Sequence, residues 1–368
     1  MQAIFGGILD FEYQQVIMIL IGLVLIYLAI VRKYEPTLLL PIGFGTILAN
    51  IPNSAAIGEH GPLQILFNAG ISTELFPLLI FIGIGAMIDF TPLLKNPSML
   101  LFGAAAQLGI FVTLAVATLL GFDLRQAGAI GIIGAADGPT SIYVANRFAR
   151  DLLPAISVAA YSYMALVPII QPPVIRLLTT KGERKIHMDY NAGDVPKIVK
   201  ILFPIIVTLI AGIFVPASVA LIGFLMFGNL IRESGVLPGL SKTAQNELAN
   251  IVTIFLGISI ASTMSGVAFL RPTTLLIFAL GLVAFIFDTA GGVLFAKLMN
   301  LFRKQKLNPM IGACGISAFP MSARVVHQMG QKEDPFNFLL MPAVSVNVGG
   351  QIGSVIAGGL ILALLGNL

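Results

Sequence analysis

The sequence predicts an all-α polytopic membrane protein with about ten membrane spans, two of them broken or re-entrant helices. The composition supports this class, because 57% of the 368 residues are hydrophobic and only 10% are charged, whereas soluble domains carry roughly 25% charged residues. A spanning helix needs roughly 20 mainly apolar residues, and barrel strands would alternate in polarity instead. Uncharged runs of helical length cover residues 16–31, 98–122, 201–231, 248–270 and 335–368.

A polar loop at residues 179–199 divides the chain into two membrane halves, residues 1–178 and 200–368. Basic residues mark three connections, and the positive-inside rule places such connections in the cytoplasm. These connections are residues 32–36, 176–200 and 297–306. The N-terminus is then expected outside, and the protein is expected in the cytoplasmic membrane as a multi-pass protein in contact with lipid. Because the basic residues lie in short loops between spans, nucleic-acid binding is not expected.

The two halves share a local pattern. Residues 131–141 read GIIGAADGPTS and residues 312–322 read GACGISAFPMS, with Gly at positions 1 and 4, Pro at 9 and Ser at 11 in both. We expect broken helices at 131–141 and 308–324. Interrupted segments at corresponding places in two halves are typical of inverted-repeat transporters and indicate the binding site. A broken helix exposes backbone groups that lipid does not tolerate unless they line a cavity. An ordinary kink packed on its neighbours is the alternative.

Asp137 is the most informative residue of the first break. A charge at the bilayer centre costs at least about 2.5 kcal/mol on insertion scales, so this carboxylate is expected to bind something. Thr140 and Ser141 follow it, and hydroxyl and carboxylate oxygens suit a hard cation such as Na⁺. Asp137 can also carry a proton, or alternate between the two. A static ion pair with Arg324 is the structural alternative.

The second break carries Asn308, Ser317 and Arg324. An intramembrane Arg can hold a substrate carboxylate through two hydrogen bonds, or act as a displaceable counter-charge for Asp137. The alternative for Arg324 is a helix-end side chain that reaches to the membrane interface.

Further polar residues interrupt apolar runs elsewhere. Tyr161 and Tyr163 can relay a proton or simply pack, since a buried phenol needs a partner. Asn347 lies in a third glycine-loosened stretch. Asp288 can be a second cation ligand or pair with a neighbouring helix, and the sequence leaves both readings open.

Together these motifs resemble a known family, the membrane-integral beta subunits of sodium-pumping, biotin-dependent decarboxylases. The relatives act on oxaloacetate, methylmalonyl-CoA, glutaconyl-CoA or malonate. The resemblance runs through most of the chain. The matching stretches are residues 133–140, 160–173, 178–185, 227–236 and 308–324.

The resemblance implies a division of labour. A carboxyltransferase alpha subunit moves CO₂ to biotin on a separate carrier subunit, and the beta subunit decarboxylates the carboxybiotin, consumes a proton and exports Na⁺. A small membrane-anchor subunit and a homotrimeric core are also implied. By resemblance, the catalytic residues are Asp137, Tyr163 and Arg324, with Arg324 also contacting carboxybiotin. By the same resemblance, the residues of the Na⁺ site are Asp137, Asn308, Gly312, Ser317 and Asn347.

A Na⁺-coupled carboxylate symporter without chemistry is the alternative function, because its broken helices and Arg324 would look much the same. No P-loop is present, so nucleotide hydrolysis by this chain is not expected. The chain departs from the family at residues 342–347, which read PAVSVN where the family usually has HAMGPN. Nor does this sequence specify the acid that is decarboxylated, since that choice belongs to another subunit.

Overall fold

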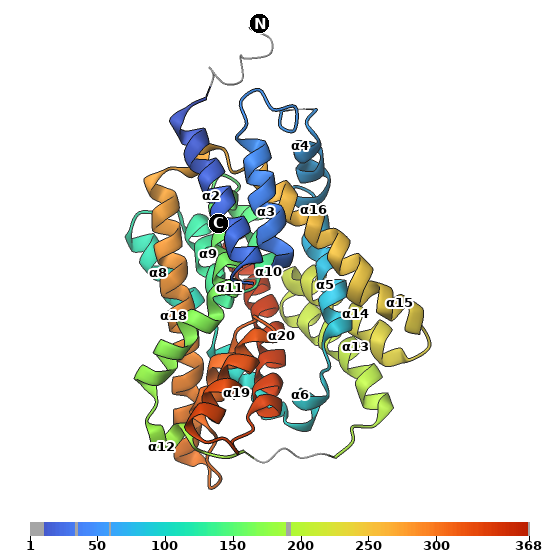
Figure 1. Ribbon diagram of the computed structural model, residues 1–368. Coiled ribbons are helices and arrows are strands. Elements are labelled where there is room, and N and C mark those ends of the chain that lie inside the picture. The colour runs from blue at the N-terminus through green and yellow to red at the C-terminus, as the bar shows by residue number, and fades with distance from the viewer. Residues whose placement is uncertain (1–10, 34–35, 59, 189–192, 367–368) are drawn as a thin grey trace, which may run out of the picture.

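The computed structural model describes residues 11–33, 36–58, 60–188 and 193–366. These residues form helices and connecting turns, with no β-strand among them. Figure 1 shows the longer helices running roughly side by side, with the C-terminal helix inside the bundle. An all-α membrane protein is therefore confirmed.

The elements fall into two groups by length. The longer helices are α2 (Tyr13–Ile30), α3 (Pro36–Ala49), α5 (Leu75–Met87), α8 (Leu108–Leu119), α11 (Leu153–Leu178), α13 (Lys197–Phe214), α14 (Val219–Ser234), α16 (Ala249–Ala261), α18 (Pro272–Phe302), α19 (Met321–Glu333) and α20 (Leu340–Leu365). The shorter elements are α4 (Pro62–Leu66), η1 (Phe67–Ile71), α6 (Thr91–Lys95), η2 (Pro97–Met99), α7 (Leu100–Ala105), α9 (Leu124–Gly131), η3 (Ile132–Ala135), α10 (Gly138–Phe148), α12 (Lys181–Arg184), η4 (Pro216–Ser218), α15 (Pro238–Thr243), η5 (Ala244–Leu248), α17 (Gly266–Phe269) and η6 (Pro309–Gly315).

Within the described residues, eight helical segments are long and apolar enough to cross a membrane, or nine if one bent pair forms a single span. That pair is Pro62–Ile71 with Leu75–Met87, bent by 66°. This count does not confirm the expected total of about ten, because the interrupted segments are too short to be counted. Helices α9 and α10, for example, have 8 and 11 residues.

Hairpin 1, residues 124–148, enters the bundle and returns to the same end. Its first limb is α9, its tip is η3 with residues 136–137, and its second limb is α10. The base is held together by Gln126 Nε2, which donates to Asp151 Oδ2 at 3.1 Å. The Arg125 guanidinium also lies 5.9 Å from the centre of the Phe148 ring. The interrupted segment therefore doubles back instead of crossing the bundle.

Hairpin 2, residues 308–333, is built in the same way from η6 and α19. Asn308 Nδ2 donates to the Arg184 carbonyl at 2.9 Å, and Arg184 Nε donates to Glu333 Oε1 at 2.7 Å. The two ends of the hairpin thus meet at the loop that carries α12. The hydrogen bond from Arg184 holds the pKa of the Glu333 carboxyl below its usual value.

The two hairpins enter from opposite ends of the bundle and meet at their tips. At the base of hairpin 1, Arg125 Nε donates to the Leu365 carbonyl, 3.3 Å away. Leu365 lies in the last turn of α20. Hairpin 2 instead starts and ends near the first turn of α20. At the tips, Ser317 N donates to the Ala135 carbonyl at 2.9 Å. This is the arrangement that the repeated motif predicts.

The described parts of two basic connections, residues 176–188 and 297–306, lie at the same end of the bundle, the lower end in Figure 1. Lys297 Nζ joins them, since it contacts the Leu178 carbonyl at 2.9 Å and Glu183 Oε1 at 3.1 Å. The C-terminal end of α2, where the third basic connection begins, lies nearer the middle of that view. Residues 34–35 of that connection lie outside the described residues, as does the segment 1–10.

Candidate functional site

Asp137 lies at the point where the tip of hairpin 1 turns back into a helix. Ala136 has a left-handed backbone (φ 51°), and Asp137 is extended (φ −125°). Pro139 follows at the second helical position, where its missing N–H costs no hydrogen bond. The local sequence therefore ends one helix and starts the next around the carboxylate.

The Asp137 carboxylate is almost completely buried, with 3% of its surface exposed. Its Oδ1 atom accepts from Thr140 N at 3.1 Å, which caps α10. Its Oδ2 atom accepts from Ser317 Oγ at 3.2 Å and from Ser354 Oγ at 2.8 Å. Three elements therefore contribute to this site, namely hairpin 1, hairpin 2 and α20.

Ser317 was expected at this site from the sequence, whereas Ser354 and Gln351 were not. Asn347, Gln351 and Ser354 are spaced by four and three residues along α20, so they share one helix face. Asn347 Nδ2 donates to the carbonyls of Cys314 at 3.2 Å and Ile316 at 2.8 Å. Gln351 Nε2 donates to the Ser317 carbonyl. Polar residues at helical spacing in an apolar run were the signal that could have identified this face.

A cavity of about 270 Å³ adjoins Asp137 and Ser317, and Tyr161 and Gln351 also line it. Two amide oxygens at this junction, Gln351 Oε1 and Asn347 Oδ1, are buried and have no hydrogen-bond partner within the described part of the chain. The Thr140 hydroxyl interacts with the Asp137 carboxylate itself. Buried acceptors are normally satisfied. Together with a carboxylate and two serine hydroxyls, these oxygens are the ligand types that a hard cation prefers.

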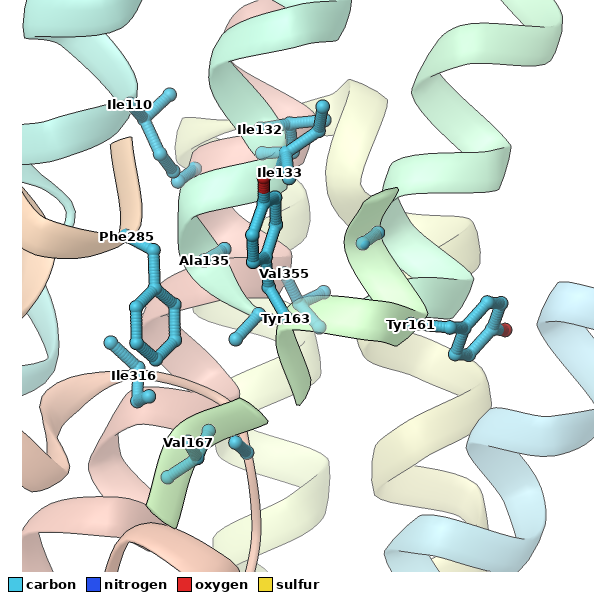
Figure 2. Close-up of a cluster of buried hydrophobic side chains, with 14 of the residues drawn as sticks. Ile110, Ile132, Ile133, Ala135, Tyr161, Tyr163, Val167, Phe285, Ile316 and Val355 are labelled. Carbon is cyan, nitrogen blue, oxygen red and sulfur yellow. The ribbon is translucent and has the colours of Figure 1, made fainter. Parts of the chain in front are cut away.

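The two tyrosines point in different directions from α11, as Figure 2 shows. Tyr163 Oη donates to the Phe278 carbonyl of α18, and its ring stacks on Phe285 with centres 6.4 Å apart. Tyr161 instead lines the cavity beside Asp137. The structure therefore brings Tyr161 to the Asp137 cavity and directs Tyr163 toward α18.

Arg324 does not form an ion pair with Asp137. It lies on the first turn of α19 and is exposed, and its side chain makes no hydrogen bond or ion pair with any residue that the structure describes. Its guanidinium is therefore available to an anionic ligand.

Gly312 lies inside η6 and approaches α18 backbone to backbone. A Cβ atom built on it would lie less than 3.0 Å from the Gly292 carbonyl, and the reverse is also true. Only glycine fits such an approach. Gly312 therefore contributes to the close packing of hairpin 2.

Asn308 lies at the base of hairpin 2, away from Asp137. The intervening η6 has 7 residues, and a 3₁₀-helix rises about 2.0 Å per residue, or roughly 14 Å in all. Its Nδ2 donates to the carbonyls of Arg184 and Ile186, both at 2.9 Å, and its Oδ1 accepts from Met310 N at 3.1 Å. Every polar atom of this amide is thus used to anchor the hairpin.

Replacing Asn308 by Ala should therefore destabilise the protein more than it weakens cation binding. We expect a loss of about 1–3 kcal/mol, since two buried carbonyls lose a donor, while Asn337 still donates to both at 3.1 and 3.3 Å. Thermal unfolding measured across a Na⁺ titration checks this. Asn246→Ala, an exposed amide bonded only to Lys242 O, is the control. Unchanged unfolding with a large drop in Na⁺ affinity would make Asn308 a ligand instead.

Comparison with known proteins identifies relatives along nearly the whole chain. The family model described as the Na⁺-transporting oxaloacetate decarboxylase beta subunit matches residues 14–365. The methylmalonyl-CoA decarboxylase subunit beta of Veillonella parvula is 54% identical over 362 residues, which cover 98% of this chain and 96% of the relative. The glutaconyl-CoA decarboxylase subunit beta of Acidaminococcus fermentans is 53% identical over 361 residues, with the same coverage.

A third relative carries a different substrate name. The probable oxaloacetate decarboxylase beta chain of Vibrio cholerae is 46% identical over 418 aligned positions, covering 97% of this chain and 96% of the relative. The resemblance inferred from the motifs is therefore confirmed. The chain belongs to the family of Na⁺-transporting decarboxylase beta subunits and is a multi-pass membrane subunit of such a decarboxylase.

Proposed function

We propose that this subunit decarboxylates carboxybiotin presented by a partner and couples the reaction to Na⁺ export, with Asp137 at the centre of the ion site. The observation that carries the proposal is the convergence of Asp137, Ser317 and Ser354 where two opposed hairpins meet. Irregular backbone and a buried carboxylate at such a junction are the usual elements of a transporter ion site. Family membership supplies the coupling to decarboxylation.

Na⁺ would bind at the Asp137 carboxylate, with the hydroxyl oxygens of Thr140, Ser317 and Ser354 around it and the unpartnered amide oxygens of Gln351 and Asn347 on the same face of α20. The two serine hydroxyls now donate to Oδ2, and their lone pairs are still available to a cation. A bound Na⁺ neutralises a carboxylate that would otherwise be a costly charge inside the bundle. Asn308 and Gly312 would act through the packing of hairpin 2.

Carboxybiotin would enter from the end that carries the basic connections, whose positive charge attracts its carboxylate. Exposed Arg324 is suited to hold that carboxylate. Decarboxylation consumes one proton, because carboxybiotin and H⁺ give biotin and CO₂. Tyr161 lines the cavity that adjoins Asp137, which makes its phenol a better placed proton donor than Tyr163. Moving one charge against 100 mV costs about 2.3 kcal/mol, which the reaction must supply for each ion.

The proposed assembly contains a biotin carrier subunit, a carboxyltransferase alpha subunit and a small membrane-anchor subunit around a homotrimeric core of this chain. The acid that is decarboxylated would be chosen outside this chain. Relatives named for methylmalonyl-CoA and for glutaconyl-CoA are almost equally similar to it, at 54% and 53% identity. A chain that selected the acyl-CoA would be expected to differ more between them.

The direct test is Na⁺-dependent decarboxylation of free carboxybiotin by the purified chain with its partners in lipid vesicles. We expect CO₂ release that requires Na⁺ and is accompanied by ²²Na⁺ movement across the membrane. Uptake of a dicarboxylate by vesicles that contain this chain alone, without decarboxylation, would favour the symporter alternative and contradict the proposal.

Replacing Ser354 by Ala should weaken Na⁺ activation while leaving the fold intact. A hydrogen bond to a charged group contributes about 1.5–3 kcal/mol, so we expect the apparent Na⁺ affinity to fall by roughly 10- to 100-fold. The measurement is the Na⁺ dependence of decarboxylation. Ser345→Ala is the matched control, because Ser345 is buried on the same helix and donates to the Pro92 carbonyl at 2.8 Å. Equal effects of the two substitutions would remove Ser354 from the site.

A further inference from the structure

A second buried acid, Asp288, lies in the middle of α18 and is completely inaccessible to solvent. Its Oδ1 atom accepts from Gly109 N at 2.5 Å, at the start of α8, and the Ile110 N–H lies close to the same carboxyl. Its Oδ2 atom is buried and has no hydrogen-bond partner within the described residues. No Lys, Arg or His side chain pairs with it in that part of the chain. One oxygen of a buried carboxyl is therefore left without an evident partner.

Two helix interruptions meet at this carboxyl. One is the break between α7 and α8, which leaves the N–H of Gly109 free to donate to Oδ1, whereas Ile110 N donates to the Gln107 carbonyl at 3.2 Å. The other is the tip of hairpin 1, where a Cβ built on Gly134 would lie less than 3.0 Å from Asp288 Oδ2. A Cβ on Gly109 would approach Oδ1 equally closely. The carboxyl thus fits between the start of α8 and the backbone of Gly134.

The internal repeat places an amide at the equivalent position. The two motifs are offset by 181 residues (312 − 131), an offset that relates Gln107 to Asp288 and Gly134 to Gly315. Gln107 is buried, and its Nε2 donates to the Gly103 carbonyl at 2.8 Å and to the Gly315 carbonyl at 3.4 Å. Each repeat therefore places a polar side chain against the tip glycine of the other repeat. At the tip of hairpin 2 that side chain is a hydrogen-bond donor.

A protonated carboxyl can serve as the same kind of donor. An ionised carboxylate is an acceptor only, whereas the acid form has one O–H donor and keeps an acceptor oxygen. Leaving an ionised carboxylate oxygen unpaired in an apolar interior is very costly. The Gly109 N–H at the N-terminus of α8 already donates to Oδ1, and the positive end of that helix disfavours a cation there. Placing a proton on Oδ2 therefore costs less free energy here than binding a metal ion at the same oxygen.

We propose that Asp288 is a proton-binding site, and that its protonated Oδ2 donates a hydrogen bond to the backbone of hairpin 1 at Gly134. Loss of this proton leaves an anion against the tip and releases hairpin 1 from α18. Helix α8 carries no titratable side chain, and α18 itself carries Lys297 at its far end. The other elements packed on α18 contribute Arg125 and Asp137 from hairpin 1, Cys314 from η6, and Tyr161, Tyr163 and Arg176 from α11. None of these is hydrogen-bonded to Asp288. The inference does not depend on Na⁺ binding at Asp137.

Infrared spectroscopy of the lipid-embedded protein tests the protonation directly. We expect the difference spectrum between wild type and Asp288→Asn to contain the carbonyl stretch of a protonated carboxylic acid at neutral pH, with and without Na⁺. A carboxylate band in its place, or an acid band that disappears when Na⁺ is added, would overturn the proposal. If Asp288→Asn fails to fold, the acid carbonyl band is followed through a pH titration of the Asp137→Asn protein instead. That protein lacks the carboxyl of Asp137, the other buried acid at the hairpin tips, so the remaining band reports Asp288.

Hydrogen exchange tests the link to the hairpin. Asn at position 288 has a permanent N–H donor, so we expect the amides of residues 132–137 to stay protected from neutral to alkaline pH in Asp288→Asn. In the wild type the same amides should lose protection relative to the variant as the pH rises. Comparing the two proteins at each pH cancels the intrinsic pH dependence of exchange. Identical protection in both proteins across the range would contradict a proton-dependent contact, whatever the outcome for Na⁺ transport.

Discussion

Replacing Asp137 by Asn is expected to abolish Na⁺ transport and Na⁺-stimulated decarboxylation while the protein remains folded. Asn caps a helix about as well as Asp, so Thr140 N keeps its acceptor and α10 keeps its start. What the substitution removes is the negative charge that faces Ser317 and Ser354. Substituting residues that merely support a metal site costs about 10- to 100-fold in affinity. Loss of the central carboxylate should cost at least about 100-fold.

The measurement is ²²Na⁺ transport and CO₂ release from carboxybiotin, with Na⁺ varied over several orders of magnitude. Asp123→Asn is the matched control, since Asp123 caps α9 of the same hairpin by accepting from Arg125 N at 3.0 Å but is exposed at its base. This control should behave like the wild type. An Asp137→Asn protein that retains both activities would exclude the carboxylate from ion binding.

Replacing Gly312 by Ala is expected to have the largest effect on stability. The new methyl group would lie less than 3.0 Å from the carbonyl of Gly292 and would also crowd the next residue of α18. Since the atoms in the way are backbone, no side-chain rotation relieves the clash. Overpacking costs about 1–3 kcal/mol and occasionally more, and we expect this site to be near or above the upper value. Hairpin 2 would move away from α18 and take Ser317 away from Asp137.

Thermal unfolding in detergent, with activity measured on the same samples, checks this expectation. Gly239→Ala is the control, because a methyl group there meets no atom within 4 Å. We expect a clear loss of thermal stability and activity for Gly312→Ala and neither for Gly239→Ala. A Gly312→Ala protein with normal unfolding but weakened Na⁺ activation would contradict a packing role for this glycine.

The sequence was sufficient for several features because they depend on local chemistry. The shortage of charged residues indicates that the chain folds in lipid, and the uncharged runs of helical length indicate that its spans are helices. The spacing of Gly and Pro shows where backbone hydrogen bonding fails, and both interruptions lie within the stretches that the repeat indicated. Asp137 was evident because a charge in an apolar segment is costly whatever surrounds it.

Other features depend on how the helices pack, and they could not be derived from the residues alone. Tyr161 and Tyr163 are two positions apart on a helix, so they point to different sides, and only the packing of α11 decides which side faces Asp137. Asn308 and Ser317 belong to one motif, but hairpin 2 places them at its base and its tip.

Ser354 shows the same limit most clearly, because its spacing from Asn347 and Gln351 indicates a polar face of α20 but not what that face contacts. Its hydroxyl becomes part of the site only where α20 passes both hairpin tips. The sequence by itself therefore determined the membrane fold, the positions of the two breaks and the prominence of Asp137. Each follows from the free-energy cost of placing a local charge or an unpaired backbone group in lipid. The tertiary structure alone decided which oxygens surround Asp137, because side chains from distant segments meet only through the direction and rotation of packed helices.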